Sequence, residues 1–216
     1  MSGFHFSAIS VPKDRFDEAI EHLRFNFFPD EPLNRGVRLC QKGESHCELE
    51  NHCLSTLKQG YSRMLITDDG TTIQLNDRLL LQIAGLALNG TTKVGEREEA
   101  VRRLAALDDE KFKIIFGLLY QVNDKVNLFN KYQTDELFEC RILSVDEEFR
   151  GRGLANILMS DSVEVARKAG FKHVRYRVHG MIMYNHFIER YFYYFFFKFT
   201  FCVFNYCNFP YLIRML

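Results

Sequence analysis

A glycine- and arginine-rich segment at residues 150–155, Arg-Gly-Arg-Gly-Leu-Ala, has the composition of an anion-binding loop. It stands between an expected strand and an expected helix. Gly151 and Gly153 let the backbone approach a ligand closely, and the free amides at a helix start attract negative charge. Arg150 and Arg152 add positive charge. The segment therefore predicts a phosphate or pyrophosphate site. The alternative interpretation is a strand–helix turn that carries two solvated arginines.

This loop matches neither of the two common nucleotide-binding loops. It lacks the Gly-Lys-Ser/Thr ending of a P-loop and the third glycine of the dinucleotide fingerprint. The elements expected around it are a strand at residues 137–145, a helix at residues 156–169 and a strand at residues 171–178. They form a β-α-β unit with the loop between its first strand and its helix.

The hydrophobic periodicity of the preceding residues predicts the elements that hold this unit in place. Strands are expected at residues 4–10, 63–67 and 79–88, and helices at residues 12–28, 45–59, 95–107 and 108–126. Asn89-Gly90 is the expected end of the third strand. Residues 27–34, Phe-Phe-Pro-Asp-Glu-Pro-Leu-Asn, are an expected loop. The alternation of strands and helices predicts a mixed α/β fold.

The overall composition excludes several classes of protein. The chain of 216 residues has 28 basic and 28 acidic side chains and a formal net charge of zero. Because a general nucleic-acid-binding protein needs a positive surface, this balance argues against nucleic acid as a partner. With 47% hydrophobic and 26% charged residues, the chain is globular and is neither disordered nor a polytopic membrane protein.

Six cysteines are present, at positions 40, 47, 53, 140, 202 and 207. The N-terminal residues lack a basic start followed by an apolar run, so we expect no secretory leader, reduced thiols and a cytoplasmic protein. The neighbours His46-Cys47 and His52-Cys53 raise the question of zinc. On the expected helix Cys47 and Cys53 point about 120° apart, since each residue turns by about 100°. They cannot converge on one ion, and no metal site is predicted.

The pattern Arg-x-x-Gly-x-Ala at residues 150–155 resembles the acyl-CoA pyrophosphate loop of the GNAT superfamily of N-acetyltransferases. Four further segments look like the insect-type arylalkylamine N-acetyltransferases, relatives of dopamine N-acetyltransferase. They are residues 27–34, 47–60, 83–90 and 111–132. The resemblance extends from about residue 4 to about residue 178, and its most discriminating motif is Asp-Glu-Pro-Leu-Asn at residues 30–34.

The resemblance implies the GNAT fold, a central twisted mixed sheet flanked by helices, with a V-shaped split for the pantetheine arm of the co-substrate acetyl-CoA. It implies that the backbone of Leu143, Ser144 and Val145 binds the pantetheine. A backbone amide at Leu143 or Ser144 would polarise the thioester carbonyl and stabilise the charge that develops there. The pyrophosphate would be wrapped by the amides of Arg150, Gly151, Arg152, Gly153, Leu154 and Ala155.

The resemblance also places a general base at Glu31, in the Asp-Glu-Pro-Leu motif. An alkylammonium has a pKa of about 10, like that of lysine, so most of the amine arrives protonated. A partly desolvated carboxylate suits the task of removing this proton, because burial raises its pKa toward neutrality. Pro29 and Pro32 stiffen the loop around it. Asp30 is a weaker candidate, and a solvated loop acid is the alternative interpretation of Glu31.

The C-terminal residues have a different composition from the rest of the chain. Residues 181–216 contain 9 of the 21 Phe and 6 of the 10 Tyr. We expect a GNAT domain at residues 1–178 and a divergent tail at residues 179–216 that is not family sequence, of the kind that a retained intron or a shifted exon end encodes. The C-terminal strands of the family would then be missing or replaced. A folded end with aromatic strands and a membrane segment at residues 191–209 are the alternatives.

These features predict an enzyme that transfers the acetyl group of acetyl-CoA to the primary amine of an arylalkylamine of the dopamine, tyramine, octopamine or serotonin class. The amine would attack directly, through a tetrahedral intermediate, with Glu31 as the general base. One alternative is a catalytically impaired acyl-CoA-binding form, which the tail keeps open. Another is a polyamine or peptide N-acetyltransferase on the same fold. The sequence leaves the oligomeric state open, although it favours a monomer. It does not favour a membrane as a partner.

Overall fold

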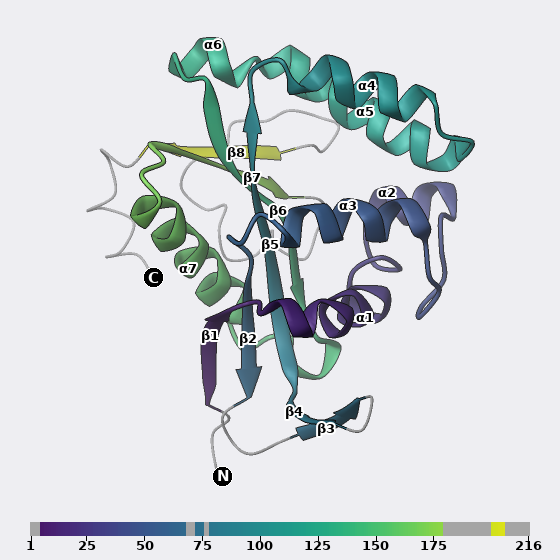
Figure 1. Cartoon of the computed structure of the whole chain (residues 1–216), viewed down its shortest axis with the longest axis vertical. Coiled ribbons are helices and arrows are strands. Elements are labelled where there is room, and N and C mark those ends of the chain that lie inside the picture. The colour runs from purple at the N-terminus through teal and green to yellow at the C-terminus, as the bar shows by residue number, and fades with distance from the viewer. Residues whose placement is uncertain (1–4, 68–71, 76–77, 179–199, 206–216) are drawn as a thin grey trace.

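The computed structural model describes residues 5–67, 72–75, 78–178 and 200–205. Its centre is a six-stranded sheet with the strand order β1-β2-β5-β6-β7-β8 (Figure 1). The strands are β1 (Phe6–Ser10), β2 (Arg63–Thr67), β5 (Ile83–Lys93), β6 (Glu136–Val145), β7 (His173–Val178) and β8 (Thr200–Asn205). Adjacent strands run antiparallel except β6 and β7, which run parallel. A separate two-stranded sheet pairs β3 (Thr72–Leu75) with β4 (Arg78–Leu81).

Helices cover both faces of the sheet, which confirms the predicted mixed α/β fold. The α-helices are α1 (Phe16–Asn26), α2 (Pro32–Val37), α3 (Cys47–Leu57), α4 (Glu96–Ala105), α5 (Glu110–Val126), α6 (Leu128–Tyr132) and α7 (Leu154–Lys168). Two short 3-10 helices, η1 (Lys13–Arg15) and η2 (Glu147–Phe149), precede α1 and follow β6.

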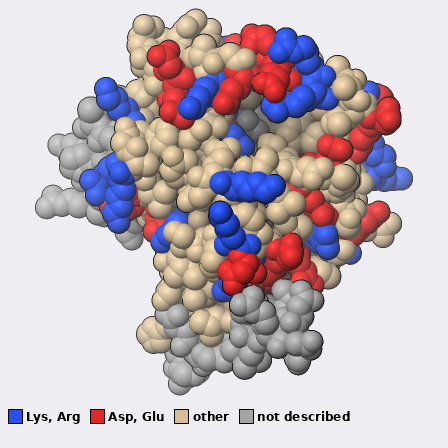
Figure 2. All heavy atoms as spheres, in the orientation of Figure 1, with Lys and Arg blue, Asp and Glu red and all other residues tan. Residues whose placement is uncertain are grey.

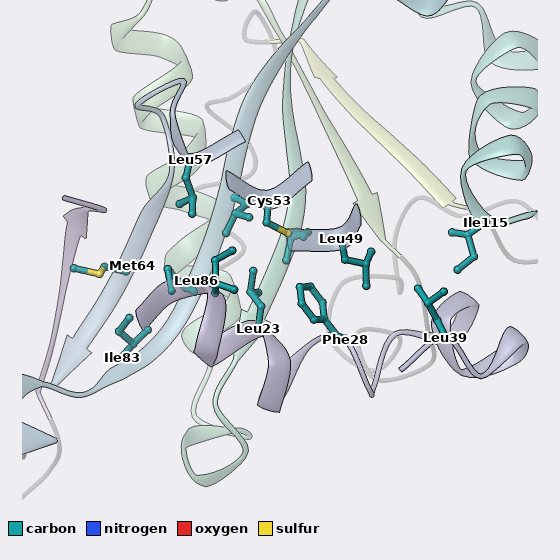
Figure 3. Close-up of a cluster of buried hydrophobic side chains, with 14 of the residues drawn as sticks. Leu23, Phe28, Leu39, Leu49, Cys53, Leu57, Met64, Ile83, Leu86 and Ile115 are labelled. Atoms are coloured by element: carbon teal, nitrogen blue, oxygen red, sulfur yellow. The ribbon is translucent and has the colours of Figure 1, made fainter. Parts of the chain in front are cut away.

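Alternate residues of the central strands face two hydrophobic cores, because successive side chains of a strand point to opposite faces. Met64 and Leu86 belong to the core that α1, α3 and α5 cover, where Leu23 of α1 is fully buried (Figure 3). Leu65 and Ala87 belong to the core beneath α7. Full burial of one such large apolar side chain contributes about 1.5–3 kcal/mol. The two cores therefore fix α1 and α7 on opposite faces of the same strands.

The strand end expected at Asn89-Gly90 is wrong, because β5 continues through both residues to Lys93. Asn89 is fully buried, and its Nδ2 donates to the Tyr61 carbonyl at 3.1 Å and to Ser162 Oγ at 2.9 Å. These tertiary bonds replace the local bonds that would make the pair a turn. The strand expected at residues 79–88 is also divided, since β4 ends at Leu81 and β5 begins at Ile83.

The predicted tail is described in one segment, β8, which pairs antiparallel with β7 along its whole length. Residues 179–199 and 206–216 lie outside the described residues. Of the proposed membrane segment at residues 191–209, only Thr200–Asn205 is described, and it is the strand β8. The boundary at residue 178 and the origin of the tail stay predictions. Among the helices that the structure describes, none has the length and apolar composition that crossing a membrane requires. On the face shown in Figure 2, basic and acidic side chains are interspersed.

Candidate active site

β6 and β7 form a parallel ladder over only three residues of β6, Phe138–Cys140, among the described pairs. β6 continues five residues further, from Arg141 to Val145. Between Leu88 and Asn89 of β5 the register shifts, which makes Arg141 the extra residue of a β-bulge. A bulge bends its strand, and this one directly follows the last pair with β7. Beyond it, in the part of the chain that the structure describes, β6 makes no further pair with β7.

Side chains on both sides of this bulge fix its position. Arg141 donates to Thr56 Oγ1 at 2.9 Å and to the Thr91 carbonyl at 2.7 Å. The fully buried Glu139 accepts from Arg175 of β7 at 2.6 Å. Removal of one partner from a buried ion pair costs about 3–5 kcal/mol. This pair therefore holds β6 and β7 together directly before they separate.

The loop after β6 has the geometry of an anion site. Gly151 has φ 78° and Gly153 has φ 76°, in the left-handed region that glycine favours. The amides of Gly151, Gly153, Leu154 and Ala155 have no hydrogen-bond acceptor among the described residues. They stand at the N-terminus of α7, whose 15 residues place the positive end of the helix dipole at the loop. These groups are suited to an anion, and the pyrophosphate site at residues 150–155 stays a prediction. The helix begins at Leu154 rather than at the predicted residue 156.

Arg150 ties the loop to the chain that follows α1. Its guanidinium donates to the Val145 carbonyl at 3.0 Å, to the Asn26 carbonyl at 3.0 Å and to Asp30 Oδ2 at 2.7 Å. Its own amide donates to the Glu147 carbonyl at 3.4 Å. The sequence predicts that Arg150 adds positive charge at the anion site, and in the structure this charge is also paired with Asp30. The ion pair joins two residues that lie 120 positions apart in the sequence.

The loop expected at residues 27–34 is wrong in its second half, because α2 begins at Pro32. Proline is preorganised for the first turn of a helix, since its φ is fixed and it has no amide hydrogen to satisfy. Glu31 is the N-cap residue, and its Oε2 accepts from the Asn34 amide at 2.7 Å. The Asn34 side chain in turn donates to the Phe28 carbonyl at 3.0 Å. Glu31 is therefore held by the helix that it caps.

Glu31 is buried, with 8% of its surface exposed, so it is not a solvated loop acid. Burial raises the pKa of its carboxyl, because the charged form is poorly solvated. Hydrogen bonds from the backbone amides of Asn34 and Leu33 oppose this effect and lower the pKa. Its neighbour Asp30 is paired with Arg150. The predicted base therefore lies one residue from the contact with the predicted cofactor loop.

Solved structures with this fold include one of high sequence identity. The crystal structure of arylalkylamine N-acetyltransferase 2 from Aedes aegypti matches with a TM-score of 0.72 and 42% sequence identity, over 80% of this chain and 76% of that chain. The chain belongs to the insect arylalkylamine N-acetyltransferase family. It is an acetyltransferase, and the predicted GNAT fold is confirmed. No protein-family model matches the chain.

More distant members of this structural group share the fold. Mosquito arylalkylamine N-acetyltransferase like 5b has a TM-score of 0.68 at 19% identity, over 80% of this chain and 76% of that chain. The polyamine N-acetyltransferase of Drosophila melanogaster has a TM-score of 0.68 at 18% identity, over 83% of this chain and 79% of that chain. At these identities the likeness concerns the fold alone.

In this N-acetyltransferase the residues predicted to bind the cofactor lie on two neighbouring segments of the chain. Leu143, Ser144 and Val145 lie on β6 beyond the bulge, and the loop of residues 150–155 follows them. The sequence analysis missed His22, whose Nε2 lies 3.0 Å from Ser144 Oγ. Burial, with a smaller effect of Arg150, lowers the pKa of His22 to about 3, so the ring is neutral. The available signal was a polar residue on the apolar face of an amphipathic helix.

The cysteine and histidine pairs of the sequence have ordinary packing roles in this acetyltransferase. Cys47 is exposed and Cys53 is buried, so the two thiols face different surroundings. The rings of His46 and His52 pack on Phe112 and Phe116, with centroid distances of 6.1 Å and 5.1 Å. In the described part of the chain, no three His, Cys, Asp or Glu side chains are grouped to hold a metal ion.

A cavity of about 1070 Å³ lies between α3, α5 and the ends of β5 and β6. Its lining includes Glu139, Arg175 and Arg141, together with Phe116 and Tyr120 of α5. These residues surround the half of β6 that precedes the bulge. The cavity is therefore displaced along the strand from the predicted pantetheine site at residues 143–145.

Proposed function

We propose that this enzyme transfers an acetyl group from acetyl-CoA to the primary amine of an arylalkylamine of the dopamine, tyramine, octopamine or serotonin class. Membership of the arylalkylamine N-acetyltransferase family supports the reaction type. The observation that carries the mechanism is Glu31, a buried carboxylate whose neighbour Asp30 pairs with Arg150 of the anion-binding loop. A proton acceptor and a cofactor site would thus be adjacent.

Glu31 is the proposed general base. The ammonium form of the amine has no free lone pair, and with a pKa of about 10 it dominates near neutral pH. Burial raises the pKa of Glu31, which makes its ionised form a stronger base than a solvated glutamate. The hydrogen bonds from the first amides of α2 favour that ionised form. Loss of the proton to Glu31, directly or through water, leaves the amine nitrogen able to attack the acetyl carbonyl carbon and form a tetrahedral intermediate.

The described backbone groups fit acetyl-CoA, which supplies the thioester when bound. The amides of Gly151, Gly153, Leu154 and Ala155 would bind its pyrophosphate. The edge of β6 at residues 143–145, which is not paired with β7 among the described residues, would bind the pantetheine with strand-like hydrogen bonds. A backbone amide at Leu143 or Ser144 would donate to the carbonyl oxygen as negative charge develops there, an effect of about 3–4 kcal/mol in other acyl transfers.

A Glu31→Gln variant tests this mechanism, because glutamine keeps the size and the N-cap acceptor and removes the base. We expect kcat/KM for the amine to fall by about 10²–10⁴-fold, with the dissociation constant of acetyl-CoA unchanged in calorimetry. Glu98→Gln, at an exposed position of α4, is the matched control and keeps the wild-type rate. Undiminished turnover of Glu31→Gln, with wild-type affinity for acetyl-CoA, removes the assignment of the base.

The choice of amine, the cytoplasmic location and the monomeric state stay predictions from the sequence. Rates on aromatic and aliphatic amines side by side distinguish an arylalkylamine substrate from a polyamine. Peptide substrates belong in the same panel, because the fold alone does not select among these amines.

A further inference from the structure

The buried face of α1 carries three polar side chains, Glu18, His22 and Asn26. Glu18 pairs with Arg15, whereas His22 and Asn26, one helical turn apart, make contacts with β6 and the chain after it. They are 8% and 9% exposed, among the apolar side chains that attach α1 to the sheet. Residues at this spacing lie on the same face of a helix. Both side chains contact residues more than 115 positions away in the sequence, at the end of β6 and the start of the cofactor loop.

His22 contacts the strand that carries the predicted pantetheine site. Its Nε2 lies 3.0 Å from Ser144 Oγ, and the backbone of Ile83 is a further hydrogen-bond partner of the ring. Ser144 is itself 3% exposed. Burial lowers the pKa of the ring, so in its neutral form it is a hydrogen-bonding group that joins α1 to Ser144 of β6.

Asn26 uses both ends of its amide on the next residues along the chain from β6. Its Oδ1 accepts from the Glu147 amide at 3.0 Å, and its Nδ2 donates to Asp146 Oδ2 at 3.3 Å. The same Nδ2 donates to the carbonyl of His22 at 3.3 Å. Asn26 therefore fixes the point at which the chain leaves β6 and turns into η2, three residues before Arg150.

We propose that His22 and Asn26 are positioning residues that hold the end of β6 and the start of the cofactor loop in register with Glu31. The chain reaches Glu31 five residues after Asn26, and it reaches Arg150 three residues after Glu147. The hydrogen bonds of His22 and Asn26 to residues 144, 146 and 147 form a seam between α1 and the end of β6. The segment that carries Glu31 and the cofactor loop both begin at this seam. Buried side chains with all their partners in place have few alternative rotamers, so the seam fixes the relative position of both halves. This inference rests on the proposed function.

Asn26→Ala and His22→Leu test the two ends of the seam. For Asn26→Ala we expect the dissociation constant of acetyl-CoA, measured by calorimetry without any amine, to rise about tenfold, because the Glu147 amide and the loop lose their anchor. For His22→Leu we expect kcat to fall about tenfold, as misplacement of a reacting group does. His22→Gln, which keeps a hydrogen-bonding group toward Ser144, restores most of the rate and leaves the shape of the pH profile unchanged.

Asn89→Ala is the matched control, since Asn89 is a buried asparagine with two hydrogen bonds in the core beneath α7. Asn89→Ala should lower the melting temperature without changing the dissociation constant of acetyl-CoA or kcat. Wild-type acetyl-CoA affinity and kcat in folded Asn26→Ala and His22→Leu overturn the proposal, as does an equal change in Asn89→Ala. A pH profile that loses a limb in His22→Gln also overturns it. The calorimetric result does not depend on Glu31, so a failure of the base assignment is distinguishable from a failure of the seam.

Discussion

Replacement of Gly153 by alanine tests how much the cofactor loop depends on its left-handed backbone conformation. Gly153 has φ 76°, and a Cβ at this position meets no atom within 4 Å. The cost is therefore the left-handed conformation alone, about 1–2 kcal/mol for a residue with a Cβ. In a protein of this size each kcal/mol shifts the melting temperature by about 2–4 °C. We expect Gly153→Ala to melt about 2–8 °C lower than the wild type.

The assay is thermal unfolding with and without saturating acetyl-CoA. We expect the stabilisation by acetyl-CoA to be smaller in Gly153→Ala, because relaxation of the strained residue turns the loop amides away from a common point. Gly117→Ala is the matched control, since Gly117 lies within α5 and a Cβ there also meets no atom within 4 Å. It should gain about 0.5–1 kcal/mol. A Gly153→Ala protein that melts and binds acetyl-CoA like the wild type would refute the anion-site geometry.

Three further predictions concern the base, the pairing of β5 with β6 beside residues 143–145, and the core. Burial raises the pKa of the Glu31 carboxyl above its ordinary 4.5, so this residue contributes most to stability at low pH, and the contribution is lost as the pH rises through the pKa of the folded state. In urea unfolding we therefore expect the free energy of unfolding of Glu31→Gln, relative to that of the wild type, to be higher at about pH 7 than at about pH 4. In Gly85→Ala, a Cβ would lie 2.9 Å from the Ser144 carbonyl oxygen, so we expect a loss of about 1–3 kcal/mol and weaker acetyl-CoA binding in calorimetry. Leu23→Ala, at a fully buried site, should cost about 2–5 kcal/mol in urea unfolding without changing acetyl-CoA affinity.

Local patterns in the sequence were sufficient for the β-α-β unit and for the place of the glycine-containing loop between its first strand and its helix. Periodicity locates β6 and α7 to within two residues, and the glycines of the loop have the positive φ that their spacing suggests. Such signals work because the determinants, alternating burial and backbone freedom, lie within a few residues of one another. The strand end predicted at Asn89-Gly90 was wrong for the opposite reason, because hydrogen bonds to Ser62, directly before β2, and to Ser162 of α7 outweigh the local preference for a turn.

The candidate site required more than local pattern. Glu31 was predicted through the family resemblance, whereas its role as the N-cap of α2, which begins at Pro32, was not predicted because residues 27–34 were expected to be a loop. The contacts of Arg150 with Asp30 and of His22 with Ser144 join residues 120 and 122 positions apart. No local rule pairs residues at that separation, so these contacts emerged with the fold.

Acetyl transfer to an arylalkylamine is the central claim, and formation of the N-acetylated amine tests it most directly. The full chain is incubated with acetyl-CoA and each of dopamine, tyramine, octopamine, serotonin and aliphatic polyamines, and both free thiol and product mass are measured. We predict one acetylated amine for each thiol released, with the aromatic amines preferred and no release without an amine. An absence of acetylated aromatic amine, under conditions in which acetyl-CoA still raises the melting temperature, would contradict the claim.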